Sequence, residues 1–161
     1  MNSNRPTLSE LRTASSADID ALNSLLRGEM SAVETYDQAH GKFTNRPVLL
    51  ELNRIRDEHR DSVSVLRGKV RDCGGEPSES SGPWGTFAQA VTGTAKVMGP
   101  VSVLATLKQG EEHGISDYEK ILHDDDVAED CKDLIQAVLL PKCRLHVLSL
   151  DRSIAAIETV S

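Results

Sequence analysis

The sequence predicts an all-α fold, an antiparallel four-helix bundle made of two helix pairs. Aromatic residues form only 3% of the chain, and the aliphatic residues that supply most of its apolar content suit packed helices better than a β-sandwich. Apolar residues recur at helical spacing in four long segments, each bounded by residues that start or stop helices. At 161 residues, the chain has the length of one domain.

Residues typical of helix ends delimit the first helix pair. Ser15 or Ser16 can cap the first helix, and Asn45 followed closely by Pro47 is typical of the start of the second. Gly74-Gly75 then stops the second helix. We therefore expect one helical domain at 17–161 that begins, after a polar leader at 1–16, with helices over about residues 17–43 and 47–73.

The second helix pair follows a polar connection. Gly99-Pro100 restarts the chain, and the acidic turn at 124–126 supplies an N-cap for the last helix, which Pro141 should kink. A short extra helix is expected in the connection at about 84–97, although its glycines weaken it. The two long helices of this pair are expected over about residues 100–123 and 126–158.

The first and third helices contain an internal repeat. The segment from Leu22 to Tyr36 aligns without gaps with the segment from Leu104 to Tyr118, 82 residues later. Both segments contain the string L-x-[ST]-L-x-x-G-E, followed by six residues and a tyrosine. Chance similarity between amphipathic helices would match leucines, but it gives no reason to match Gly-Glu and Tyr as well. Descent of both helix pairs from one hairpin explains the repeat.

Two glutamates occupy core positions in the repeated helices. Glu29 and Glu111 each fill the place in the apolar stripe that helical spacing turns inward. The second and fourth helices each turn one histidine inward, His59 and His146. In antiparallel helices, residues equidistant from the connecting turn meet, so all four side chains are expected at one level of the bundle.

Burial of a carboxylate costs several kcal/mol unless its negative charge is compensated. The sequence allows two ways to compensate Glu29 and Glu111. Arg56 can neutralise both glutamates directly, with the histidines completing a metal-free hydrogen-bond network. Alternatively, two carboxylates and two imidazoles can bind one transition metal ion, Fe, Zn or Mn. The metal ligands would then be Glu29, His59, Glu111 and His146.

Neighbouring residues have simpler expected roles. Tyr36 and Tyr118, two helical turns beyond their glutamates, can donate hydrogen bonds that orient metal ligands from neighbouring helices. Glu58, Glu112 and His113 are turned about 100° away from the core positions, so we expect them on solvated faces or in subunit contacts.

The repeated strings resemble the ferritin-like superfamily. Gly-Glu-x6-Tyr looks like the first and third helices of rubrerythrin and bacterioferritin, where that glutamate is a di-iron ligand. The Glu-x-x-His motif of their second and fourth helices corresponds here to Arg56-Asp57-Glu58-His59 and Cys143-Arg144-Leu145-His146. Both histidines are retained, but Arg56 and Cys143 replace the two glutamates. The resemblance therefore implies a degenerate di-iron motif.

The whole pattern is most similar to bacterial ferritin-like domains of unknown function, over roughly 17–154. That resemblance implies a ferritin-like fold, a homo-oligomer with a dimer favoured, and a stress-related role without an agreed reaction. Because the dinuclear carboxylates are lost, we expect a non-catalytic or weakly metal-binding protein. Cys143 is then either a thiolate ligand or a small buried hydrophobe.

Two other functions stay open. One is a metal-dependent redox enzyme with a mononuclear site of two glutamates and two histidines. The other is a metal-free interaction or assembly module, in which the acidic surface and the insert at 84–97 form the contact face.

Charge and hydropathy argue against other classes. The formal net charge is -7 and Lys and Arg form no block, so nucleic acid is not an expected partner. No run approaches the ~20 apolar residues of a membrane span, and 1–16 lacks the apolar stretch of a secretory signal. We expect a cytoplasmic protein without a membrane partner, whose three cysteines stay reduced.

Overall fold

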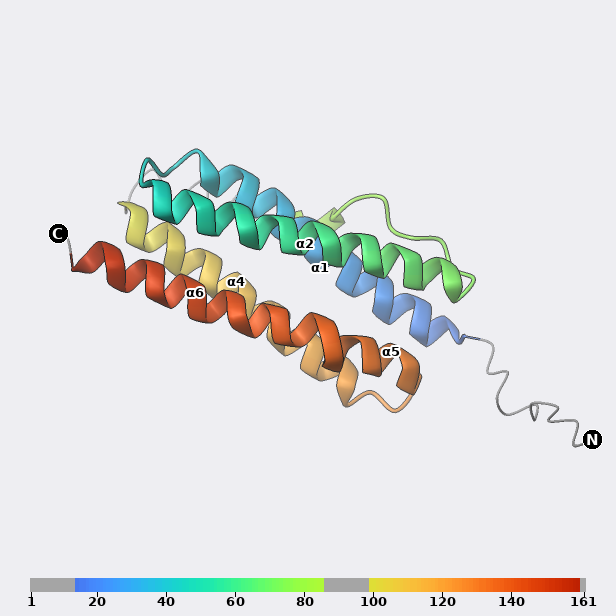
Figure 1. The fold of residues 1–161 in the computed structure, drawn as a ribbon. Helices are drawn as coiled ribbons and strands as arrows, with labels where there is room; N and C mark the ends of the chain where they lie inside the picture. Colours follow the sequence, from blue (N-terminus) through green and yellow to red (C-terminus); the bar gives the residue numbers. More distant parts are fainter. Residues whose placement is uncertain (1–13, 86–98, 160–161) are drawn as a thin grey trace, which may run out of the picture.

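The computed structural model describes residues 14–85 and 99–159, which contain helices and no strand. Four long helices account for most of them (Figure 1): α1 (Ser16–His40), α2 (Arg46–Asp72), α4 (Gly99–Leu122) and α6 (Leu140–Glu158). Three shorter elements are the 3-10 helix η1 (Gly82–Gly85), α5 (Glu129–Leu134) and the π-helical turn η2 (Ile135–Leu139). Most of the expected leader and of the expected short helix, at 1–13 and 86–98, lies outside the described residues.

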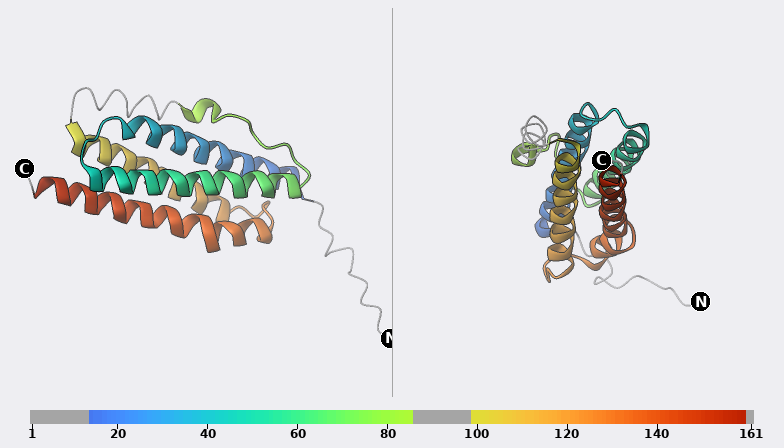
Figure 2. Two further views of the ribbon diagram at one scale, coloured as in Figure 1. Left: turned by 45° about the horizontal axis from the view of Figure 1, so that its top comes forward. Right: turned by 90° about the vertical axis from the view of Figure 1, so that its left-hand side faces the viewer.

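The four long helices lie side by side around one core (Figure 1, Figure 2). Within each hairpin, α1 with α2 and α4 with α6, the helices run antiparallel, whereas α2 and α4 run in the same direction. The chain must therefore return along the molecule after α2. Its described part does so over α1, where Asn23 donates a 3.0 Å hydrogen bond to the carbonyl of Glu76 and Ser81 donates one of 2.9 Å to Glu34.

Side-chain caps fix the starts of α1 and α2 where the sequence predicts them. The Ser15 hydroxyl accepts a 3.2 Å hydrogen bond from the backbone of Asp18, whose carboxylate accepts one of 2.8 Å from the backbone of Ser15. Asn45 caps α2 by accepting from the backbone of Val48. Gly74, with φ of 77°, lies just beyond the end of α2, in a conformation that favours glycine.

The start of the last helix differs from the prediction. It begins at Glu129, and no side chain caps it, so the expected N-cap from the acidic turn at 124–126 is wrong. Within that turn, Asp124 accepts a hydrogen bond from the backbone of Asp126 instead. The backbone N–H of Ala128 donates a 2.6 Å hydrogen bond to Asp18, which is fully buried at the start of α1. The Asp18 carboxylate of α1 thus binds the backbone of the residue that precedes α5.

Pro141 follows a π-helical turn. Proline lacks a backbone N–H and its ring crowds the preceding turn, so an ordinary helix tolerates it poorly. In η2 the turn is widened, with the N–H of Leu140 donating to the carbonyl of Ile135, five residues earlier. The irregularity expected at Pro141 therefore lies just before it, and Cys143 and His146 remain buried beyond it.

Two apolar clusters fill the core at different levels. The first joins the early part of α1 to the late part of α2 and to the start of the last helix, and includes Leu22, Leu26, Leu66, Ile135 and Leu139. The second joins the opposite ends of the long helices and includes Leu52, Ile55, Leu104, Leu107 and Leu150. Between these clusters lie the buried glutamates and histidines. Among the described helices, none has the length and apolar character that a membrane span needs.

Candidate metal centre

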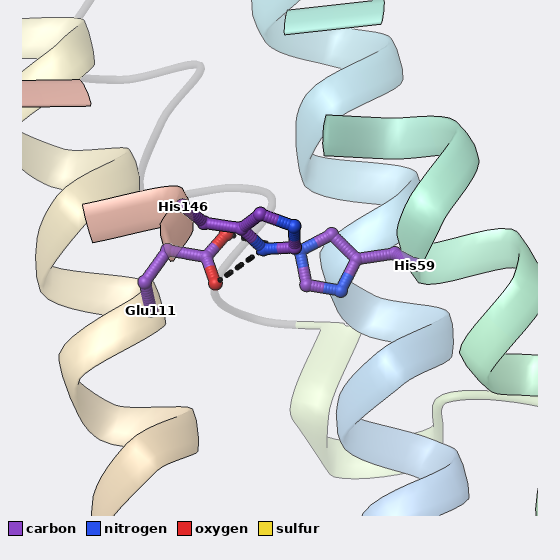
Figure 3. Close-up of side chains that lie close together, drawn as sticks. All are labelled: His59, Glu111 and His146. Carbon is purple, nitrogen blue, oxygen red and sulfur yellow. Dashed lines mark hydrogen bonds and ion pairs between the residues drawn. The ribbon is translucent and has the colours of Figure 1, made fainter. Parts of the chain in front are cut away.

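The four predicted ligand residues come together between the two apolar clusters. Glu29, His59, Glu111 and His146 project from α1, α2, α4 and α6, and none is more than 7% exposed. Figure 3 shows the rings of His59 and His146 meeting the carboxylate of Glu111. The helical stripes thus place these side chains at one level, as the sequence predicts.

Glu111 is the centre of this group. Its Oε1 lies 2.9 Å from Nε2 of His59, and its Oε2 lies 3.2 Å from Nδ1 of His146. The two imidazole rings meet edge to face with centroids 4.8 Å apart. One ligand atom from each of the three residues lies within 4.8 Å of the others, so this buried group can hold a metal ion.

Each histidine contacts a second carboxylate through its other ring nitrogen. Nδ1 of His59 lies 2.7 Å from Oε2 of Glu29, and Nε2 of His146 lies 2.8 Å from Oε2 of Glu58. Glu58 was expected on a solvated face or in a subunit contact. Its side chain is 29% exposed, yet it also reaches inward to His146. The turn of about 100° between Glu58 and His59 aims Glu58 toward α6 rather than toward the centre.

The two tyrosines of the repeat make the predicted hydrogen bonds, and they do so across the repeat. Tyr36 donates a 2.6 Å hydrogen bond to Oε1 of Glu111, and Tyr118 donates a short one to Oε1 of Glu29. Burial, reinforced by the neighbouring glutamates, raises the pKa of both phenols well above the usual value. Both hydroxyls therefore remain donors.

Cys143 lies against Glu111 as well. Its buried sulfur is 3.1 Å from Oε2 of Glu111 and 3.3 Å from the backbone carbonyl of the same residue. Burial, and then the carboxylate of Glu111, raise the pKa of the Cys143 thiol strongly. Without a bound cation, Cys143 is thus a thiol that donates to Glu111.

Arg56 is absent from this group, and the prediction that it neutralises Glu29 and Glu111 is wrong. The guanidinium lies at the surface, 3.1 Å from Asp37 and 3.1 Å from Asp57. The buried position next to it in the sequence belongs to Ile55, which is fully buried. A long charged side chain is more stable in solvent when an aliphatic neighbour can fill the core position.

His59 takes the role that Arg56 was expected to have. Burial alone would lower the pKa of His59, but the attraction of Glu111 and Glu29 and their hydrogen bonds raise it to about 10. Burial would raise the pKa of Glu111, but His59 and His146 hold it well below its usual range. Without metal, an imidazolium bridges two carboxylates. Accordingly, every buried side-chain nitrogen and oxygen in the described part of the chain has a partner.

A cavity of about 490 Å³ between α1 and α4 reaches this group. Much of its wall consists of small residues, among them Gly28, Ala32, Gly110 and Gly114. Gly28 and Gly110 are the glycines of the repeated Gly-Glu pairs, so the repeat leaves open space beside each core glutamate. The polar side chains that line the cavity include Glu29, Tyr36, His59, Glu111, Tyr118 and Cys143.

Comparisons with known proteins identify a family for this chain. A search of curated proteins and a search of solved structures each find no match to this chain. A family profile described as "Domain of unknown function (DUF2383)" matches residues 17–124, more than half of the chain. The match includes Glu29, His59 and Glu111, whereas Cys143 and His146 follow it. The chain therefore belongs to the DUF2383 family of domains of unknown function.

Proposed function

We propose that the protein is a ferritin-like four-helix bundle that binds one divalent transition metal ion through His59, Glu111 and His146. One observation carries the proposal. Each histidine directs one ring nitrogen toward Glu111 and has its other nitrogen against a second carboxylate. Metal-bound histidines in proteins nearly always have such an outer partner, which fixes the tautomer and makes the ligand nitrogen more basic.

In this proposal Glu29 and Glu58 orient the histidines. Glu29 accepts from Nδ1 of His59 and leaves Nε2 for the ion, while Glu58 accepts from Nε2 of His146 and leaves Nδ1 for it. The sequence predicts Glu29 as a metal ligand. In this proposal it instead accepts a hydrogen bond from the ligand His59 and does not contact the ion. Imidazole and carboxylate donors suit Zn, Fe or Mn.

The ferritin-like assignment is supported by topology and by the repeat. Two antiparallel hairpins joined by one long crossover are the arrangement of ferritin-like bundles, and the Gly-Glu-x6-Tyr strings lie on the helices where that superfamily has them. The second pair of carboxylates is missing, because Arg56 points outward and Cys143 replaces the other glutamate. We therefore propose a mononuclear site rather than a dinuclear one.

Metal binding has to displace a proton from His59. The metal-free network is complete, with the imidazolium of His59 between Glu29 and Glu111. A divalent ion supplies the positive charge that this proton supplies without metal, so the same carboxylates stabilise either state. The proposal therefore predicts proton release on binding and affinity that increases with pH.

Metal analysis tests the proposal. Protein stripped with a chelator is incubated with Zn(II), Mn(II) or, without oxygen, Fe(II), then desalted and its metal content measured. We expect about one ion per chain for at least one metal and loss of that ion in His59→Ala and His146→Ala. His123→Gln, which changes an exposed histidine at the end of α4, should keep it. Less than ~0.2 ions per chain for every metal would overturn the proposal.

A second candidate function rests on the cavity. Its volume of about 490 Å³ and its contact with Glu111 and His59 would let a small molecule reach the ion. The metal-loaded protein would then be a redox enzyme that consumes dioxygen or peroxide. Wild-type turnover is compared with that of Gly28→Leu, which places a side chain in the cavity from a position where an added Cβ meets no atom within 4 Å. The control is Gly68→Leu on α2, where a side chain also meets open space.

Enzyme activity requires turnover that Gly28→Leu abolishes while the bound metal is retained, with Gly68→Leu behaving as wild type. If metal-loaded wild type shows no turnover, the redox function is wrong and only the metal-binding function stays.

A further inference from the structure

We infer that Cys143 is a direct ligand of the ion, which makes the centre a site of one thiolate, one carboxylate and two imidazoles. This inference rests on the proposed function, because it assigns a further ligand to the same ion. A sulfur ligand distinguishes this centre from one that has only nitrogen and oxygen ligands. It also changes which metal ions the centre prefers.

The first observation is the placement of Cys143 and His146 on one turn of α6. The two residues are three apart, so both side chains lie on the same face of the helix, and both are buried. They approach the same oxygen, since Oε2 of Glu111 lies 3.1 Å from the sulfur of Cys143 and 3.2 Å from Nδ1 of His146. Cys143 and His146 thus both approach one carboxylate oxygen from α6, while the three ligand atoms that lie within 4.8 Å of one another belong to His59, Glu111 and His146.

These separations fit neighbouring ligands of a single ion. An ion about 2.1 Å from an oxygen and about 2.3 Å from a sulfur holds the two about 3.1 Å apart at a right angle and about 3.6 Å apart at a tetrahedral angle. The distance between Oε2 of Glu111 and the sulfur of Cys143 is 3.1 Å. His59 approaches the other oxygen of the same carboxylate, 2.9 Å from Oε1, and completes the group from α2.

The alternative role of Cys143, a small buried hydrophobe, fits Cys131 better. Cys131 is 1% exposed and packs in the apolar cluster near the start of the last helix, with Leu22 and Val70. Cys143 belongs to the same cluster and is also buried, but its sulfur lies 3.1 Å from a carboxylate oxygen of Glu111. The cavity also reaches Cys143, so an ion entering by that route meets the sulfur.

Ligation exchanges the thiol proton for the ion. The bond between sulfur and hydrogen breaks, the sulfur keeps the electron pair and binds the ion, and the proton passes to solvent, in addition to the proton lost from His59. A thiolate favours Zn(II), Co(II) or Fe(II) over hard ions such as Mg(II) and Mn(II). The site should therefore retain Zn(II) in competition with a large excess of Mn(II).

Cobalt(II) gives a direct spectroscopic test, because bound Co(II) has visible d–d bands and a thiolate ligand adds a charge-transfer band in the near ultraviolet. Metal-free protein is titrated with Co(II), and bound cobalt is measured after desalting. We expect both kinds of band in wild type. In Cys143→Ser the near-ultraviolet band should disappear while cobalt remains bound. Cys131→Ser should behave as wild type.

A second variant covers the case in which Cys143→Ser does not fold. In the double variant Cys73→Ser, Cys131→Ser, the only remaining thiol is Cys143 and the site is unchanged. Retention of the near-ultraviolet band there assigns it to Cys143. Failure of wild type to bind cobalt or any other tested metal would overturn the proposed function and this inference together. Bound cobalt with d–d bands and no charge-transfer band would overturn the thiolate ligand alone.

Discussion

The hydroxyl of Tyr36 donates a 2.6 Å hydrogen bond to Glu111, a residue of the other helix pair. The equivalent tyrosine of the repeat, Tyr118, donates to Glu29 in return. Each half of the repeat thus supplies the donor that the other half's buried carboxylate needs. The exchange ties the two hairpins together at the level of the candidate metal centre, and it gives the tyrosine of the repeat a physical role.

Tyr36→Phe and Tyr118→Phe should both destabilise the metal-free protein. Each substitution removes a donor from a buried carboxylate while changing the side-chain volume little, and such a loss costs about 1–3 kcal/mol. Urea unfolding of chelator-treated protein, followed by circular dichroism, measures the change. Ser64→Ala, which removes an exposed hydroxyl from α2, is the control for nonspecific effects. Unchanged unfolding midpoints in both tyrosine variants would contradict this role.

Arg56→Ala and His59→Gln should have very different effects. Arg56 forms ion pairs at the surface, so its loss should cost no more than ~1 kcal/mol. His59 lies between two buried carboxylates, and removal of its positive charge should cost about 3–5 kcal/mol. The free energy of unfolding at neutral pH separates the two cases. Equal losses would contradict the assignment of this compensation to His59.

The stability of the metal-free protein should decrease at both extremes of pH. The folded-state pKa of His59 is about 10, above its ordinary 6.5. Its contribution is therefore fully present below about pH 6.5 and is lost as the pH rises through about 10. The folded-state pKa of Glu111 is lowered, so its contribution is present above its ordinary 4.5 and is lost as the pH falls through the folded value.

Urea midpoints measured from about pH 2 to about pH 10.5 on chelated protein test this dependence. His59→Gln should lose the decrease on the alkaline side and keep some loss on the acid side. An alkaline decrease of the same size in this variant would assign it to other groups.

Asp18→Ala should destabilise the protein more than Asp20→Ala. Asp18, in the first turn of α1, closes the capping box with Ser15 and accepts from the backbone of Ala128, whereas Asp20, two residues further along the helix, is exposed. Loss of both interactions should cost about 2–3 kcal/mol. Thermal unfolding compares the two variants. A loss for Asp18→Ala no larger than that for Asp20→Ala would show that the contact with Ala128 adds nothing.

Much of the centre could be predicted from sequence because the signals are periodic or repeated. Glu29 and Glu111 stand in apolar stripes, and the repeat aligns each with a tyrosine two turns later. Helical spacing fixes which side chains turn inward. Antiparallel pairing then fixes their level relative to the connecting turns, which was enough to bring His59 and His146 to the same place.

Other features depend on contacts that no local pattern encodes. Ile55 and Arg56 both fit the stripe of α2 within the tolerance of helical spacing, and only packing decides that the isoleucine is buried. The hydrogen bond from Ala128 to Asp18 joins residues 110 apart in the sequence. The partnership of Glu58 with His146 depends on how α2 and α6 face each other, which periodicity within one helix does not determine.

A zinc-loaded crystal, with anomalous data collected on both sides of the zinc absorption edge, tests the central claim most directly. We expect one strong peak per chain between Nε2 of His59, the carboxylate of Glu111 and Nδ1 of His146, with Glu29 and Glu58 on the outer ring nitrogens. No peak at this place in crystals grown with excess zinc, with His59 still bridging Glu29 and Glu111, would contradict the metal centre.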